Sequence, residues 1–274
     1  MLSDDKRRYL EEKASIIRKH VMEMIYRAQS GHPGGSLSLA DIMAVLYFHD
    51  LNYDVKNPKS LNRDRVVLSK GHAAPVLYAA LAEAGFFSKD ELWKLRKINS
   101  LLQGHPCIHI PGVDATTGSL GLGLSAACGM AIGAKLKKMN RVRIYAILGD
   151  GELGEGQIWE AAMAASHFKL DNLIAILDRN RYQNDGATEE ILKLEPLHDK
   201  WESFGWNVIN IDGHNINQIA DAFSLARETK ERPTMIIAKT VKGKGASYML
   251  NKPDLHYMPP TKEQLEQTLK ELMF

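Results

Sequence analysis

The chain has 274 residues, enough for one large α/β domain or two small ones. Its hydrophobic fraction of 45% and charged fraction of 25% are ordinary for a globular protein, and a net charge of +2 gives no argument for nucleic acid or a membrane surface as a partner. No stretch is apolar enough to span a membrane, and the first residues lack a signal-peptide pattern. The two cysteines lack the spacing of metal ligands. We therefore expect the protein to reside in a reducing cytoplasm.

Hydrophobic periodicity and turn signals predict mostly helices in the first half of the chain. The elements expected there are a helix at 3–28, a helix from Ser38 or Asp41 to Tyr47, a strand at 66–68, a helix through Leu81, a glycine- and proline-rich loop at 104–121 and a helix at about 122–137. Residues 31–35, Gly-His-Pro-Gly-Gly, end the first helix because glycine and proline interrupt helices.

The second half of the chain alternates strands with helices. The strands are expected at 142–148, 173–178, 206–211 and 234–238, and the helices at about 155–167, 196–204, 216–229 and 261–272. Such alternation predicts an α/β fold with a parallel sheet covered by helices on both faces. No linker or repeat interrupts it, so we expect one domain over 1–274.

Polar side chains follow two of these strands where the strands end. Gly149-Asp150-Gly151 directly follows one apolar run, and Asn180 follows the next run, about one strand–helix–strand unit later. Asp-Gly is also a common turn dipeptide, but the asparagine after a second buried strand favours a binding site. In a parallel sheet Asp150 and Asn180 would lie side by side at the ligand-binding edge. Their oxygens suit a hard cation such as Mg²⁺, which in turn holds a diphosphate.

A glycine-rich loop, Gly118-Ser119-Leu120-Gly121-Leu122-Gly123, opens into a helix whose N-terminus offers N–H groups to an anion. A nicotinamide site is disfavoured, because that motif follows a strand and this loop does not.

Several histidines stand in glycine-bounded turns, which let a side chain project into a cleft. His32 and His105 each lie in Gly-His-Pro, while His72 and His214 each follow a glycine. Imidazoles placed in this way can bind phosphate oxygens, orient hydroxyls and relay protons near neutral pH.

An ordered series of short motifs identifies a family. The motifs are Ser30-Gly31-His32-Pro33-Gly34, Leu68-Ser69-Lys70-Gly71-His72-Ala73, Gly104-His105-Pro106, Thr116-Thr117-Gly118-Ser119-Leu120-Gly121, Gly149-Asp150-Gly151-Glu152, Asp185-Gly186, Lys239-Thr240, Gly243-Lys244-Gly245 and His256. Each motif is weak alone, but the series resembles transketolase throughout the first half of that enzyme and covers essentially this whole chain.

The resemblance implies a thiamine diphosphate (TPP)-binding fold and a role for individual residues. It implies metal ligands at Asp150, Asn180 and the carbonyl of Tyr182, diphosphate contacts at His72 and Gly151, thiamine contacts at Gly118 and Leu120, and substrate-channel residues at His32, His105 and His256. Glu155 and Glu160 match residues at the subunit interface near the cofactor, with a solvated helix face as the alternative. Oxygen ligands accept Mg²⁺, Ca²⁺ or Mn²⁺.

Four positions depart from the pattern of many family members. Ser119 stands where proline is frequent, Lys70 where asparagine is frequent, and Lys242 and Lys244 add positive charge. These differences either adjust the binding of diphosphate or sugar phosphate, or have no measurable effect.

The resemblance also implies a partner. In transketolases, the glutamate that activates the cofactor lies in a following pyrimidine-binding domain. We therefore expect the N-terminal subunit of a split transketolase, which transfers a two-carbon ketol unit between sugar phosphates with a C-terminal partner subunit, in an α₂β₂ assembly. Self-association into a homodimer, through the small-residue helix at 122–134, is a further expectation. A truncated chain, a ketoacid dehydrogenase or deoxyxylulose-phosphate synthase fragment, and a non-catalytic scaffold remain alternatives.

Overall fold

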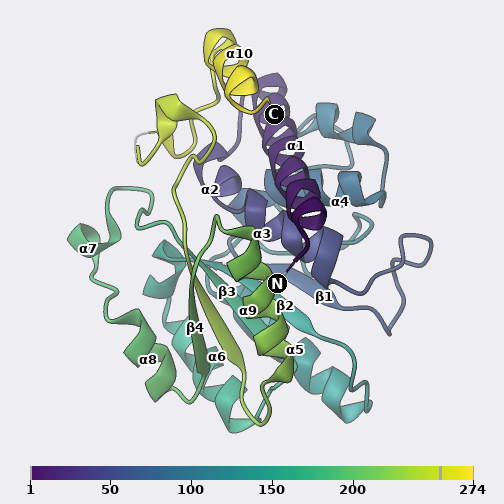
Figure 1. Cartoon of the computed structure of the whole chain (residues 1–274), viewed down its shortest axis with the longest axis vertical. Coiled ribbons are helices and arrows are strands. Elements are labelled where there is room, and N and C mark those ends of the chain that lie inside the picture. The colour runs from purple at the N-terminus through teal and green to yellow at the C-terminus, as the bar shows by residue number, and fades with distance from the viewer. Residues whose placement is uncertain (1, 253–254, 274) are drawn as a thin grey trace.

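A parallel β-sheet forms the centre of the computed structural model, which describes residues 2–252 and 255–273 (Figure 1). In that part of the chain the strand order is β1-β2-β3-β5-β4, with every neighbouring pair parallel. The strands are β1 (Arg65–Leu68), β2 (Ile144–Gly149), β3 (Leu173–Arg179), β4 (Asn207–Asp212) and β5 (Thr234–Lys239). The α-helices are α1 (Asp4–Ala28), α2 (Pro33–Leu37), α3 (Ala40–Val45), α4 (Ala74–Ala84), α5 (Leu122–Leu136), α6 (Gly156–His167), α7 (Thr188–Ile191), α8 (Leu197–Ser203), α9 (Ile216–Glu228) and α10 (Lys262–Glu271).

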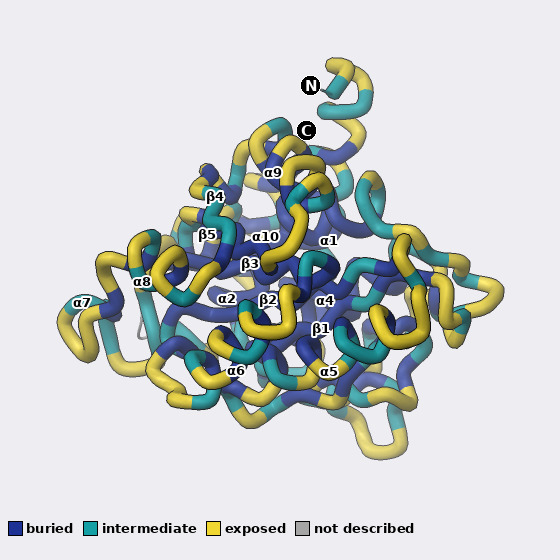
Figure 2. Tube along the Cα trace, turned by 90° about the horizontal axis from the view of Figure 1, so that it is seen from below, coloured by how far each residue is buried: buried dark blue, intermediate teal, exposed yellow. Residues whose placement is uncertain are grey.

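Both faces of the sheet are covered, as Figure 2 shows by the buried strands at the centre. Successive side chains of a strand point to opposite faces, so β2 contributes to two separate cores. Tyr145 and Ile147 pack with α1, α3, α4 and α9, whereas Ala146 and Leu148 pack with α5, α6 and α8. The predicted α/β fold, a parallel sheet with helices on both faces, is confirmed.

The segment after α1 contains one helix more than expected, and the helix expected from Ser38 or Asp41 is present as α3, which begins at Ala40. The glycine- and proline-rich turn does end α1, but α2 begins within it at Pro33, because proline is well suited to the first turn of a helix. Neither Ser38 nor Asp41 caps the next helix: the Ser38 hydroxyl donates to the buried carboxylate of Asp178, and Asp41 pairs with Arg18. Tertiary partners therefore override the local capping signal.

The first and last helices of the described chain lie side by side, which Figure 1 shows as α1 in purple against α10 in yellow. The Ser15 hydroxyl in α1 donates a 2.7 Å hydrogen bond to the carbonyl oxygen of Leu272, just beyond α10. Within the described residues, no helix combines the length and apolar character that a membrane crossing requires.

Candidate active site

A cavity of about 500 Å³ opens at the carboxyl edge of the sheet. All residues predicted for the site except Glu155 and Glu160 line it: His32, His72, His105, Gly118, Leu120, Asp150, Gly151, Asn180, Tyr182 and His256. Their segments follow α1, β1, β2, β3 and β5 and include the long loop that the sequence predicted. Sheet topology thus brings together residues that lie far apart in the chain.

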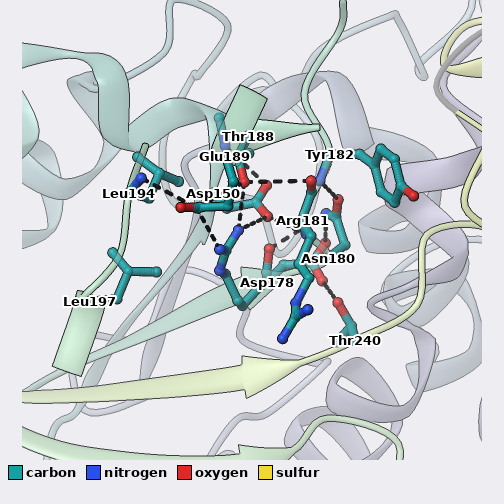
Figure 3. Close-up of polar contacts among 12 residues, drawn as sticks. Asp150, Asp178, Asn180, Arg181, Tyr182, Thr188, Glu189, Leu194, Leu197 and Thr240 are labelled. Carbon is teal, nitrogen blue, oxygen red and sulfur yellow. Dashed lines mark hydrogen bonds and ion pairs between the residues drawn. The ribbon is translucent and has the colours of Figure 1, made fainter. Parts of the chain in front are cut away.

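Asp150 and Asn180 lie side by side, because β2 and β3 are paired in register from Ile144 to Gly149 (Figure 3). The Asp150 carboxylate accepts hydrogen bonds from the Arg181 N–H at 2.5 Å and the Gly151 N–H at 3.0 Å. The side-chain oxygen of Asn180 accepts from the N–H of Tyr182 at 3.0 Å. Two side-chain oxygens are therefore held in fixed orientations on adjacent strand ends.

The negative charge of Asp150 is disfavoured by its burial and by the neighbouring carboxylate of Asp178. Burial and the nearby carboxylate of Asp178 raise the pKa of Asp150 to about 6, although Arg179 opposes the shift from 3.2 Å. A divalent cation would relieve this repulsion, and oxygen atoms are the ligands that Mg²⁺ prefers. Among the described residues no three His, Cys, Asp or Glu side chains gather as a metal-binding group. The fit to a cation thus rests on Asp150, Asn180 and a backbone carbonyl.

Three imidazoles that line the cavity contact one another. The ring centroids of His32 and His72 are 5.1 Å apart, and those of His32 and His256 are 5.3 Å apart. Burial, followed by the charge of Lys70, lowers the pKa of His72 to about 2, while burial and Lys242 lower that of His256 to about 3. These imidazoles are therefore neutral at physiological pH. No described residue hydrogen-bonds to Nδ1 of His32 or His256.

Lys242, whose role the sequence left open, is buried at the same cavity. Its side chain is 2% exposed, and within the described residues its ammonium group has no hydrogen-bond partner. The ammonium lies 5.8 Å from the ring centroid of Tyr182. Burial lowers the pKa of Lys242 to about 8, although Asp150 raises it. Burying an ammonium for which no described residue provides an acceptor is costly, so this position suits an anionic ligand.

Lys70 has a different environment from Lys242. It forms a buried ion pair with Asp178, a residue that is 0% exposed, and donates to the carbonyl oxygen of Gly35 at 2.9 Å. Thr240 and Ser38 also donate to this carboxylate. Burial would raise the pKa of Asp178, but Lys70 and the hydroxyl donors hold it below its usual value. This network joins the ends of β1, β3 and β5, and its members Lys70 and Gly35 line the cavity.

Glu152 is a cavity residue that the sequence did not single out. It is 2% exposed and accepts hydrogen bonds from the Ser69 hydroxyl at 2.5 Å and the Gly121 N–H at 2.9 Å. The glycine-rich loop therefore meets an anion of the protein itself at the N-cap of α5. Its position in Gly149-Asp150-Gly151-Glu152 could have identified Glu152 as a site residue. A glutamate is seldom buried, however, so the residue type alone predicts an exposed side chain.

Three candidates lie outside the cavity. Glu155 and Glu160 are exposed at the start and on the outer face of α6, so their interface role stays a prediction. The glycine-bounded turn of His214 suggested that its side chain projects into the cleft, but His214 is not among the described residues that line the cavity. It bonds through Nδ1 to Asp41 at 2.7 Å, and its Nε2 accepts from the Val241 N–H at 2.8 Å. Both ring nitrogens of His214 therefore form hydrogen bonds within the fold.

Comparison with known proteins places this site in a family. The family profile described as "Transketolase, thiamine diphosphate binding domain" matches residues 10–274. One subunit of an apulose-4-phosphate transketolase from Phocaeicola vulgatus is 43% identical over 96% of this chain and 93% of its own length. The 6-deoxy-6-sulfo-D-fructose transketolase subunit SqwG of Clostridium sp. (strain MSTE9) is 47% identical, with 96% of each chain covered.

Longer relatives match over part of their length. Human transketolase is 45% identical over 96% of this chain, which spans 42% of the human protein. The crystal structure of transketolase from Campylobacter jejuni superposes with a TM-score of 0.92 at 36% identity, covering 97% of this chain and 43% of that one. With this profile, these identities and this shared fold, the chain belongs to the transketolase family.

Proposed function

We propose that residues 1–274 form one TPP-binding domain, which serves as the diphosphate-binding subunit of a two-chain transketolase. The reaction is the transfer of a two-carbon ketol unit between sugar phosphates, with a divalent metal such as Mg²⁺, in the cytoplasm. The observation that carries the proposal is the cavity at the sheet edge, where oxygen ligands, neutral imidazoles and the buried ammonium of Lys242, which no described residue hydrogen-bonds, converge. Similarity along nearly the whole length of two proteins named as transketolase subunits supports it.

Different residues that line the cavity suit different parts of a cofactor complex. Asp150, Asn180 and the carbonyl of Tyr182 would hold the metal ion, and the ammonium of Lys242 would neutralise diphosphate charge. His72 and Gly151 would complete the diphosphate contacts. Gly118 and Leu120, in the glycine-rich loop, would contact the thiamine. All of these residues line the cavity, and the ammonium of Lys242 has no hydrogen-bond partner among the described residues.

When bound, TPP supplies the electron sink for breaking the carbon–carbon bond of a ketose. The imidazoles of His32, His105 and His256 would bind and orient the hydroxyls of the sugar. A neutral imidazole offers one donor and one acceptor, so each hydroxyl meets a complementary partner. Because His32 and His256 line the cavity, their rings could exchange a proton with a substrate bound there.

The proposed assembly includes a partner subunit that carries the pyrimidine-binding domain, and self-association into α₂β₂. Helix α5 offers a surface for the self-association of two copies of this chain. Leu122 and Leu136 are 48% and 79% exposed, and a Cβ built on Gly129 or Gly133 would meet nothing within 4 Å. Small residues let helices approach closely, and Met163 on α6, 56% exposed, extends the same apolar character.

Reconstitution tests the proposed function. The chain is purified alone and with its companion subunit, then assayed with TPP, Mg²⁺, xylulose 5-phosphate and ribose 5-phosphate for release of glyceraldehyde 3-phosphate. We expect turnover by the pair and none by the chain alone. Turnover by this chain alone would contradict the two-chain mechanism, and absence of turnover with every ketose would contradict the activity. Asp150→Ala in the same pair is the matched inactive control.

The ketose itself is tested with a panel. Two similar subunits are named for apulose 4-phosphate and for 6-deoxy-6-sulfo-D-fructose, so both join xylulose 5-phosphate and fructose 6-phosphate as donors. The donor with the highest kcat/KM identifies the substrate class. The oligomeric state follows from sedimentation of the wild type and of Gly129→Arg, whose long charged side chain should disrupt a contact through α5.

A further inference from the structure

A single side chain contacts both Gly-His-Pro turns that bring His32 and His105 into the cavity. Nη1 of Arg96 donates a 3.0 Å hydrogen bond to the hydroxyl oxygen of Ser30. The guanidinium also lies against Gly104, where an added Cβ would be 2.8 Å from Nη2 and 2.9 Å from Cζ. Ser30 stands two residues before His32, and Gly104 directly precedes His105. The guanidinium thus bridges two turns that are far apart in the sequence.

The backbone at Arg96 is held in an unusual conformation. Its φ of +59° lies in the left-handed region, which is unfavourable for a residue with a Cβ. The N–H of Arg96 donates a 2.9 Å hydrogen bond to the carbonyl oxygen of Leu102, closing the loop that leads to Gly104. Such conformations persist where the surrounding structure holds them, often at functional sites.

The charge of Arg96 also acts on both histidines. Burial, then Arg96, then His105 and Lys242 lower the pKa of His32 to about 4. Burial and then Arg96 lower the pKa of His105. Both rings are therefore neutral near pH 7 and offer one donor and one acceptor each, which suits the hydroxyls of a sugar.

We propose that Arg96 is a positioning residue that fixes the separation and orientation of His32 and His105, so that both imidazoles contact one bound sugar together. This inference rests on the proposed sugar-binding function of the cavity. Arg96 is not among the described residues that line the cavity, so it acts through the two turns. Its loss should therefore impair the binding of the ketose and leave the binding of the cofactor intact.

The main test uses Arg96→Met and Gly104→Ala in the reconstituted complex. In each variant we expect the KM of the ketose to rise about tenfold, while the dissociation constant of TPP with Mg²⁺ changes less than about twofold. The methyl group of Gly104→Ala would displace the flexible end of Arg96, so this variant perturbs the bridge without removing it. Lys97→Met is the control, because Lys97 is an exposed cation of the same segment.

Arg96→Lys separates position from charge. A lysine keeps the positive charge but lacks the planar fork that spans two contacts, so it should share the raised KM of Arg96→Met. A wild-type KM in Arg96→Lys would overturn the proposal, since charge alone would then suffice. An unchanged KM in both Arg96→Met and Gly104→Ala would overturn it too, as would a loss of cofactor affinity equal to the loss of ketose binding.

Imidazole NMR on the isolated chain gives a readout that needs no turnover. Arg96→Met should shift the ring resonances of His32 and His105 together, whereas Lys97→Met should leave them in place. If the wild-type complex turns over no ketose, the proposed function fails, yet these spectra still decide whether Arg96 holds both turns. Unmoved resonances of both rings in Arg96→Met would overturn the positioning role.

Discussion

Replacing Asp150 by asparagine should make the cofactor-free chain less sensitive to pH and should remove its response to TPP and Mg²⁺. The carboxylate is 1% exposed, and burial with the nearby Asp178 raises its pKa to about 6, against 3.8 for an ordinary aspartate. Ionised Asp150 is therefore less stable in the folded chain than in the unfolded one. Asparagine keeps the shape and one acceptor but has no charge to lose or gain.

The size of the effect follows from the shift. A displacement of about two pKa units corresponds to about 3 kcal/mol at about 1.4 kcal/mol per unit. Because the folded pKa lies above the unfolded one, this group's stabilisation is fully present below about pH 4 and is lost as the pH rises through 6. The free energy of unfolding of the wild type, relative to Asp150→Asn, should fall by about 2 kcal/mol between about pH 4.5 and 7.5.

Urea denaturation followed by tryptophan fluorescence, in the presence of a chelator, measures this difference at each pH. In a second series, TPP and Mg²⁺ at about a hundredfold their dissociation constant should stabilise the wild type by about 2.7 kcal/mol and Asp150→Asn by nothing measurable. A difference between the two proteins that does not change with pH would refute the electrostatic reasoning. Wild-type stabilisation of Asp150→Asn by the cofactor would refute the metal site.

Three other substitutions test separate parts of the site. Asn180→Ala should weaken the binding of TPP with Mg²⁺ by about 1–3 kcal/mol in a titration, because a ligand oxygen is lost. His105→Ala should lower kcat/KM for the ketose about tenfold or more in the reconstituted enzyme and leave cofactor affinity close to normal. Lys242→Met should weaken TPP binding about tenfold or more by calorimetry, whereas Lys244→Met, at an exposed position, should not.

The edge geometry of the site was predictable, because two apolar runs separated by one helix predict adjacent parallel strands, and polar residues at their ends then meet. For this reason Asp150 and Asn180 follow the ends of the paired strands β2 and β3, as the sequence predicts, whereas their role as metal ligands stays a prediction. The cavity histidines were recognisable for a different reason: their glycine-bounded turns form part of an ordered series of family motifs.

The buried charges were not predictable in the same way. Lysine is usually exposed, and no feature of the sequence near Lys242 predicts its burial. In the structure its aliphatic stem packs against Gly34, where an added Cβ would be 3.0 Å from Cγ of Lys242. The same holds for Lys70, whose partner Asp178 is 108 residues away. Helix α2 was missed because proline and glycine interrupt helices locally, while its formation depends on contacts with distant segments. Long-range packing decides these features.

The hydrogen bond between Ser15 and Leu272 joins residues 257 positions apart, which has a consequence for synthesis on the ribosome. At about 5–20 residues per second, roughly ten to fifty seconds separate the emergence of its two partners. During that interval, the part of α1 that packs against α10 in the folded protein is not yet covered by α10. Until α10 has left the exit tunnel, the nascent chain exposes this part of α1, so a chaperone that binds nascent chains would be most useful to it before then.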